Sequence, residues 1–169
     1  PLLAAAAVAA LATPVVSRLA LALDVVDRPD ERKVNLRAGM PLLGGLAVAA
    51  GCVAGLAASW WLVEPQSFDP SKLTGFLLGS AMLLAIGMWD DRFALSAREK
   101  FPVQILAAAV AIYFGFRIDF FSNPFTGTTY GLSEWIVWPL SLLWIVGVTN
   151  AINLIDGLDG LATGLGAII

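Results

Sequence analysis

Long apolar runs alternate with short polar segments along the whole chain. A membrane-crossing helix needs roughly 17–25 predominantly apolar residues. Five runs approach or reach that length, at residues 1–23, 42–63, 73–89, 101–117 and 134–152, and residues 161–169 begin a sixth. The pattern therefore predicts an all-α fold, a polytopic bundle of transmembrane helices with about five full spans and the start of a sixth.

The composition supports a membrane protein. The chain is 59% hydrophobic and 14% charged, whereas soluble domains carry about 25% charged residues. A soluble chain of 169 residues could not bury so much apolar surface. We therefore predict one membrane domain over residues 1–169. The net charge of −3 gives no sign of a nucleic-acid partner.

Two residue types limit the available chemistry. The chain has no histidine, which removes the commonest general base and the commonest zinc ligand. The single cysteine, Cys52, lies inside an apolar run, so there is no disulfide framework. Both ends, at Pro1 and Ile169, fall within apolar runs, and we expect the chain to be a fragment of a longer protein.

Basic residues are concentrated in alternate loops. If the runs cross a membrane in turn, the segments 24–41, 90–100 and 150–160 share one side. That side carries eight of the ten basic residues and the other side carries two. Because cytoplasmic loops are enriched in Lys and Arg, we expect these three segments to be cytoplasmic. The eight are Arg18, Arg28, Arg32, Lys33, Arg37, Arg92, Arg98 and Lys100, and the other two are Lys72 and Arg117.

Two adjacent carboxylates, Asp90 and Asp91, follow the third apolar run. The C-terminal end of a helix disfavours anions, so this pair needs a compensating cation. One interpretation is a solvated helix end neutralised by Arg92. The other is a magnesium site, because Mg²⁺ binds one or two carboxylates together with substrate phosphates.

A ladder of polar residues follows the fifth run. Asn150, Asn153, Asp156 and Asp159 are spaced three apart, and Gly157 and Gly160 allow a close backbone approach. A pair of Asp-Gly turns between two helices is one interpretation. Polar groups at a membrane boundary are costly unless they bind something. We therefore expect the ladder to meet Asp90 and Asp91 and to hold a metal-bound diphosphate.

Basic and small residues add further candidates. Arg32 and Lys33 either set the topology, with local ion pairs, or contact an anionic substrate. Lys100, with Gln104 one helical turn later, either binds phosphate or anchors a helix at the interface. The motif Gly51-x-x-x-Gly55 indicates close helix packing or occurs by chance. The aromatic segment 118–133 is expected at the membrane interface.

Three ordered motifs resemble the polyprenyl-phosphate N-acetylhexosamine-1-phosphate transferases, or glycosyl transferase family 4. The resemblance covers nearly the whole chain and is most specific in the third motif. The motifs are Asp27-Arg-Pro-Asp-Glu-Arg-Lys33 with Pro41-Leu-Leu-Gly44-Gly45; Gly87-Met-Trp-Asp90-Asp91-Arg92-Phe-Ala-Leu-Ser96 with Lys100 and Gln104; and Asn150-Ala-Ile-Asn153-Leu-Ile-Asp156-Gly-Leu-Asp159-Gly160-Leu161.

The resemblance implies transfer of GlcNAc-1-phosphate from UDP-GlcNAc to undecaprenyl or another polyprenyl phosphate, with release of UMP, at the cytoplasmic face of a bacterial plasma membrane. It implies Mg²⁺, with Mn²⁺ as an alternative, and leaves a homodimer open. The catalytic residues would be Asp90, Asp91, Asp156 and Asp159, with Asp91 and Asp156 at the metal. Substrate contacts would come from Lys100, Asn150, Asn153, Arg32 and Lys33.

Some features depart from this pattern. Asn35 stands where the UDP-GlcNAc branch commonly has His, and the branch that transfers phospho-N-acetylmuramoyl-pentapeptide stays an alternative. The family's later Met-Gly-Asp-x-Gly-Ser motif and His-rich loop lie outside this sequence, so we expect this chain alone to be inactive. A transporter with broken helices, or a structural membrane fragment, is the non-enzymatic alternative.

Overall fold

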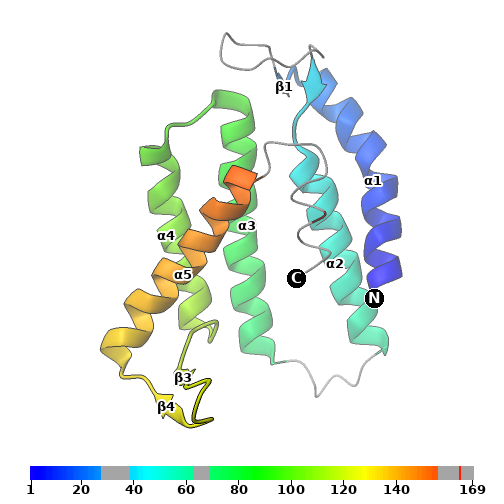
Figure 1. The fold of residues 1–169 in the computed structure, drawn as a ribbon. Coiled ribbons are helices and arrows are strands. Elements are labelled where there is room, and N and C mark those ends of the chain that lie inside the picture. Colours follow the sequence, from blue (N-terminus) through cyan, green and yellow to red (C-terminus); the bar gives the residue numbers. More distant parts are fainter. Residues whose placement is uncertain (28–38, 63–68, 156–163, 165–169) are drawn as a thin grey trace. The chain divides into compact units, whose positions relative to one another are not determined.

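The computed structural model describes residues 1–27, 39–62, 69–155 and 164. Within these ranges the chain is mainly helical, which confirms the predicted all-α class (Figure 1). The helices are α1 (Leu2–Ala22), α2 (Gly44–Leu62), α3 (Pro70–Phe93), α4 (Ala97–Tyr113) and α5 (Glu134–Ile155). Four short strands complete the described part: β1 (Val26–Asp27), β2 (Met40–Pro41), β3 (Phe120–Ser122) and β4 (Thr129–Gly131).

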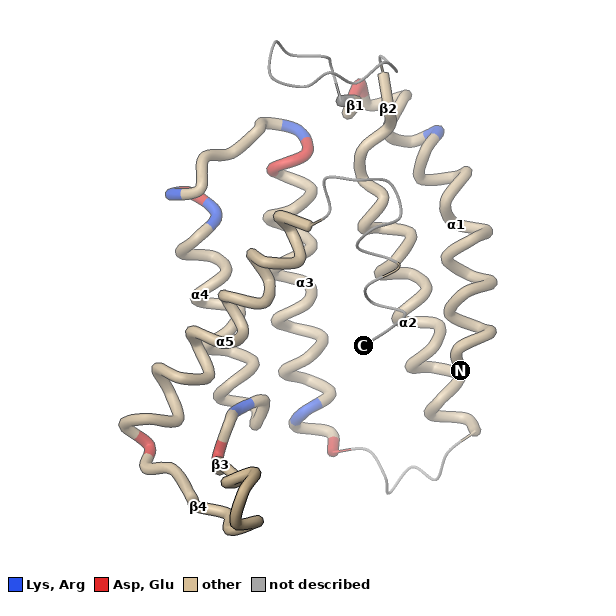
Figure 2. The backbone as a smooth tube through the Cα atoms, in the orientation of Figure 1, with Lys and Arg blue, Asp and Glu red and all other residues tan. Residues whose placement is uncertain are grey.

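Four helices in the described part of the chain, α1, α2, α3 and α5, are long and apolar enough to cross a membrane. Their large apolar side chains point outward: Leu11 is 74% exposed, Trp61 87% and Leu143 74%. Such an apolar exterior is suited to lipid as the solvent. Charged residues lie toward the helix ends (Figure 2). The helix α4 has 17 residues, and its membrane crossing stays a prediction.

The described chain divides into two compact units, the first formed by Pro1–Pro70 and Ser80–Lys100. In it, α1 and α2 pack closely through small residues. A Cβ atom on Gly51 would lie 2.7 Å from the carbonyl oxygen of Ala5 and 2.9 Å from the Cβ of Ala9. A Cβ on Gly55 would lie 3.1 Å from the Cβ of Ala5. Of the two interpretations of Gly51-x-x-x-Gly55, the structure therefore supports close helix packing over chance.

A small apolar cluster joins the end of α1 to the start of α2. Ala20, Val25 and Leu43 are its buried members, and Met88 of α3 packs against them. The strands β1 and β2 pair antiparallel, with Val26 opposite Pro41. Leu43 has a φ of 65°, an uncommon conformation for a non-glycine residue that turns the chain into α2.

The second unit contains Ser71–Gly79 and Phe101–Ile169. A Cβ on Gly75 would lie 2.2 Å from the Cβ of Phe114, so only glycine fits there. The buried residues of α4 and α5 in this unit are Ala107, Ala108, Ile112, Val137, Ser141 and Val146. The Ser141 hydroxyl accepts a hydrogen bond from the Ile118 backbone N–H at 2.9 Å, which satisfies a buried polar group.

An aromatic hairpin links α4 and α5. Strands β3 and β4 pair antiparallel, with Phe121 opposite Tyr130. At its base, Arg117 forms ion pairs with Asp119 at 2.8 Å and with Glu134 at 3.1 Å. The sequence predicted an aromatic interfacial segment here but not the strands. Its position at the membrane interface stays a prediction.

Helix bounds differ from the predicted apolar spans, because a helix can continue into a polar segment or end inside an apolar one. α3 ends at Phe93 rather than at residue 89, and α4 begins at Ala97 rather than at 101 and ends at Tyr113 rather than at 117. Pro102 lies inside α4. α5 continues to Ile155. The predicted sixth span, 161–169, lies outside the described residues apart from Gly164.

Candidate functional site

Three consecutive charged residues, Asp90, Asp91 and Arg92, occupy the last two turns of α3. They lie on the helix itself rather than after it. Successive residues on an α-helix point about 100° apart, so these three side chains reach three different neighbouring segments of the first unit. None of them is a simple solvated helix end.

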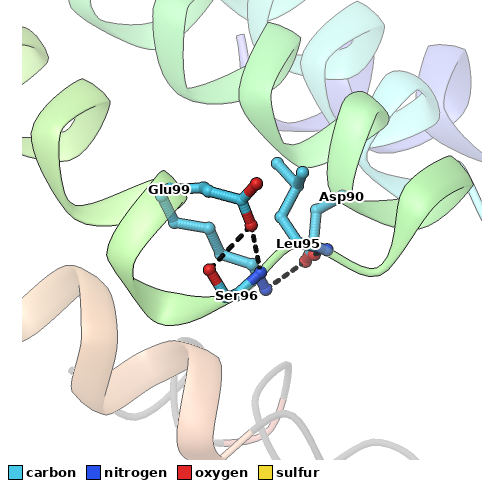
Figure 3. A network of polar contacts seen from close by, with 5 residues as sticks. Asp90, Leu95, Ser96 and Glu99 are labelled. Atoms are coloured by element: carbon cyan, nitrogen blue, oxygen red, sulfur yellow. Dashed lines mark hydrogen bonds and ion pairs between the residues drawn. The ribbon is translucent and has the colours of Figure 1, made fainter.

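Asp90 organises the turn between α3 and α4. Its Oδ1 accepts the backbone N–H of Leu95, which lies beside it in Figure 3, at 2.9 Å. Its Oδ2 accepts from the Lys100 ammonium at 2.5 Å. Ala94, with a φ of 49°, turns the chain so that Leu95 reaches back to this carboxylate. The Asp90 and Lys100 side chains are 26% and 29% exposed, so the pair is partly shielded from water.

Asp91 faces the start of α2. Its Oδ2 accepts the backbone N–H of Leu43 at 3.0 Å, one residue before that helix begins. A carboxylate at a helix N-terminus is favourable because the helix dipole is positive there. The contact offsets the unfavourable position of the same carboxylate at the C-terminal end of α3.

Arg92 faces the end of α1. Its guanidinium donates a hydrogen bond to the carbonyl oxygen of Leu23, the C-cap residue of that helix. A cation is favourable at a helix C-terminus, where carbonyl groups lack partners within the helix. Arg92 therefore stabilises the end of α1. The solvated-end interpretation required Arg92 to neutralise the Asp90–Asp91 pair, and its recorded partner is Leu23 instead.

Ser96 and Glu99 have the Ser-x-x-Glu spacing of a capping box at the start of α4. The Glu99 carboxylate accepts from the Ser96 backbone N–H at 2.8 Å and from the Ser96 hydroxyl at 2.7 Å (Figure 3). These hydrogen bonds lower the pKa of the Glu99 carboxyl, those from the Ser96 side chain most. Sequence reasoning missed this pair, although Ser-x-x-Glu is a recognised helix-start signal.

Asn150 lies on α5 in the second unit. Its amide nitrogen donates to the Gln104 side-chain oxygen at 2.8 Å and to the Val146 carbonyl at 2.8 Å. Asn153, three residues later, is exposed near the end of α5. On an α-helix a step of three leaves these two side chains about 60° apart, so they share one broad face.

Several predicted site residues lie outside the described residues: Asp156, Asp159, Arg32 and Lys33. The expected meeting of Asp90 and Asp91 with the polar ladder is therefore a prediction that these geometries do not test. Among the described residues there is no group of three or more acidic, Cys or His side chains that could hold a metal. Asp91 still offers a carboxylate of the kind that Mg²⁺ shares with substrate phosphates.

The model of glycosyl transferase family 4 matches residues 73–169, which include most of α3, all of α4 and α5, and the polar ladder. The chain belongs to glycosyl transferase family 4. The matched region covers more than half of the chain, and it includes both Asp90-Asp91 and the segment 150–160. The predicted family is therefore confirmed.

Curated members of glycosyl transferase family 4 share substantial identity with the chain. A probable undecaprenyl-phosphate N-acetylglucosaminyl 1-phosphate transferase of Bacillus subtilis is 44% identical over 92% of this chain and 41% of its own length. A decaprenyl-phosphate N-acetylglucosaminephosphotransferase of Mycobacterium leprae is 37% identical over 98% of this chain and 42% of its own. No solved structure matches the chain significantly.

A second branch of the family also matches. A phospho-N-acetylmuramoyl-pentapeptide-transferase of Limosilactobacillus reuteri is 34% identical over 78% of this chain and 41% of its own length. The chain thus spans about two fifths of the curated relatives it matches. Their identity values favour the N-acetylglucosamine branch over the muramoyl-pentapeptide branch.

Proposed function

We propose that the protein containing this chain transfers GlcNAc-1-phosphate from UDP-GlcNAc to a polyprenyl phosphate and releases UMP. The observation that carries the proposal is the 44% identity, over 92% of the chain, to an undecaprenyl-phosphate N-acetylglucosaminyl 1-phosphate transferase. The product would be a lipid-linked sugar diphosphate that begins a cell-envelope glycan, such as a teichoic acid or a lipopolysaccharide.

The reaction is a phosphoryl transfer. An oxygen of the polyprenyl phosphate forms a bond to the sugar-linked phosphorus of UDP-GlcNAc, and the bond from that phosphorus to the bridging oxygen breaks. The bridging oxygen leaves with UMP. Catalysis of such a transfer is mostly positioning and charge stabilisation. A bound Mg²⁺, or Mn²⁺, would neutralise charge on the diphosphate oxygens.

The first unit supplies groups suited to this task. An ammonium has three N–H donors, so Lys100 can remain bonded to Asp90 and still donate to a phosphate oxygen. Asp90 thus orients Lys100, in addition to the role that we propose for it in positioning the lipid phosphate. Whether Asp90 also removes a proton is secondary, because a phosphate monoester is already an anion near neutral pH.

Asp91 is the described residue best suited to hold the metal. One of its oxygens accepts the Leu43 N–H and so fixes the orientation of the carboxylate. Asp156 is the proposed second ligand, with Asp159, Asn150, Asn153, Arg32 and Lys33 completing the nucleotide and diphosphate contacts. The test is UMP release in detergent micelles containing polyprenyl phosphate. Release that stops with EDTA and returns with MgCl₂ supports the metal role, and EDTA-resistant release contradicts it.

The active site is proposed at the cytoplasmic face. Support comes from the distribution of basic residues, with seven of ten in the segments that share a side with Asp90 and an eighth, Arg18, close to that side. A soluble nucleotide sugar and a membrane-bound isoprenoid phosphate can meet only at such a boundary. Proteolysis of inside-out and right-side-out vesicles at a site inserted after Ser96 tests this placement. Cleavage only in inside-out vesicles supports it, and cleavage only in right-side-out vesicles contradicts it.

The muramoyl-pentapeptide branch is the second candidate, favoured by the 34% identity to a transferase of that branch. The two candidates differ in the donor. UDP-GlcNAc and UDP-N-acetylmuramoyl-pentapeptide are supplied separately to the same protein with polyprenyl phosphate. UMP release from UDP-GlcNAc alone supports the proposal, whereas release from the pentapeptide donor alone assigns the protein to the other branch.

A further inference from the structure

The amide of Asn150 has no free hydrogen. A primary amide carries two N–H donors, and those of Asn150 go to the Gln104 side-chain oxygen and to the Val146 carbonyl, each at 2.8 Å. The remaining hydrogen-bonding capacity of the Asn150 side chain is its oxygen, Oδ1. Asn150 can therefore meet a ligand as an acceptor and not as a donor.

The Gln104 contact fixes this orientation. Gln104 lies on the face of α4 that carries Ala107 and Ala108, which are 2% and 1% exposed. Val146, one turn before Asn150 on α5, is 7% exposed. The Gln104 and Asn150 amides are both half-buried and both belong to the second unit. If the Asn150 amide turned over, its oxygen would face the oxygens of Gln104 and Val146, which is repulsive.

We propose that Gln104 is a positioning residue, which holds Asn150 so that Oδ1 faces the bound nucleotide sugar. Such an oxygen accepts hydrogen bonds from N–H and O–H groups and repels phosphate oxygens. Asn150 therefore contacts the donor groups of the substrate rather than its diphosphate. This inference rests on the proposed transferase function.

The test is a double-mutant cycle in the complete gene product, with Gln104→Leu, Asn150→Ala and the double variant. Each protein is assayed for kcat/KM by UMP release from UDP-GlcNAc and for its unfolding midpoint in detergent. Loss of a group that orients a ligand-binding side chain costs roughly 10- to 100-fold. We expect Gln104→Leu to lower kcat/KM by about tenfold, and the double variant to be no worse than Asn150→Ala alone.

Two further variants separate positioning from simple structural support. Gln104→Glu keeps an oxygen that accepts from Asn150, so we expect it to restore kcat/KM to within about threefold of the wild type, a small part of the positioning loss. Ser141→Ala removes a different hydrogen bond that ties α5 to a neighbouring segment of this unit, the one between the Ser141 hydroxyl and the Ile118 N–H. We expect Ser141→Ala to lower the unfolding midpoint and leave kcat/KM unchanged.

Three results would overturn the inference while the wild type is active. In the first, the losses of kcat/KM in Gln104→Leu and Asn150→Ala multiply in the double variant. In the second, Gln104→Glu is as slow as Gln104→Leu. In the third, Ser141→Ala loses as much kcat/KM as Gln104→Leu does. A wild-type protein that releases no UMP from UDP-GlcNAc contradicts the proposed function itself, and the inference fails with it. The two failures are therefore distinguishable.

Discussion

The carboxylate of Asp91 accepts the backbone N–H of Leu43 at 3.0 Å, across 48 residues of sequence. This contact gives a residue proposed for metal binding a structural partner at the start of α2. The two roles predict different effects for different substitutions, because an amide keeps an oxygen acceptor for Leu43 but lacks the negative charge.

Asp91→Asn is expected to fold normally and to lose activity. The amide oxygen replaces the carboxylate toward Leu43, while the charge that would hold a metal is gone, so UMP release should fall at least about 100-fold. Asp91→Ala should lose the same activity and also about 1–3 kcal/mol of stability, because the Leu43 N–H loses its partner. Kinetics and detergent unfolding measure both effects. Near-normal turnover in Asp91→Asn would contradict the metal role.

Lys100→Gln is expected to reduce kcat/KM about 100-fold, since it removes the ammonium proposed to bridge Asp90 and a phosphate. The same charge change at Arg98, which is exposed in the same helical turn, provides the control. Arg98→Gln should leave kcat/KM within about twofold of the wild type, as for an ordinary surface change. Equal losses in the two variants would mean that net charge alone is responsible.

The hydrogen bonds from Ser96 to the Glu99 carboxylate predict a pH-dependent stability. Because hydrogen bonds lower the pKa of Glu99 in the folded protein below its usual 4.5, its contribution is present above that value. The contribution is lost as the pH falls through the lower, folded pKa. Glu99→Gln should therefore lower the unfolding midpoint at pH 7, and the difference from wild type should shrink below pH 4.5. A difference that grows on acidification would contradict this sign.

Gly51→Leu is expected to separate α1 from α2. Even a Cβ would lie 2.7 Å from the Ala5 carbonyl oxygen, so the larger side chain should cost about 1–3 kcal/mol or more. Gly87 provides the control, because a Cβ there meets no described atom within 4 Å. Gly87→Ala should not destabilise the protein and should gain slightly from its helix propensity. Equal unfolding midpoints for Gly51→Leu and the wild type would exclude the close packing.

The apolar pattern predicted the helices because a membrane helix needs a continuous apolar segment. The motif Gly51-x-x-x-Gly55 left close packing and chance open, and the structure shows close packing. The pattern could not give the helix ends, since Asp90, Asp91 and Arg92 read as a loop by hydropathy. Those residues remain helical because backbone groups of Leu95, Leu43 and Leu23 compensate their charges. Hydropathy does not detect such partners, since they are backbone groups and two of them are distant in sequence.

For the candidate site, too, the sequence indicated the residues but not their contacts. Residue type and spacing indicated Asp90, Asp91, Lys100 and Asn150, and the motifs indicated the family. They did not show that Asp90 pairs with Lys100, or that Gln104 takes one hydrogen of the Asn150 amide. Such pairings depend on side-chain direction between segments. The Ser96–Glu99 contact, in contrast, could have been predicted from its local Ser-x-x-Glu spacing, although it was missed.

The central claim is that a sugar phosphate, and not the sugar alone, moves to a polyprenyl acceptor. The most direct test supplies the complete gene product with polyprenyl phosphate and UDP-GlcNAc radiolabelled at the sugar-linked phosphorus. The proposed reaction predicts that the label appears in the lipid fraction while unlabelled UMP is released. Label that stays in released UDP, or no transfer at all, would contradict the proposed function.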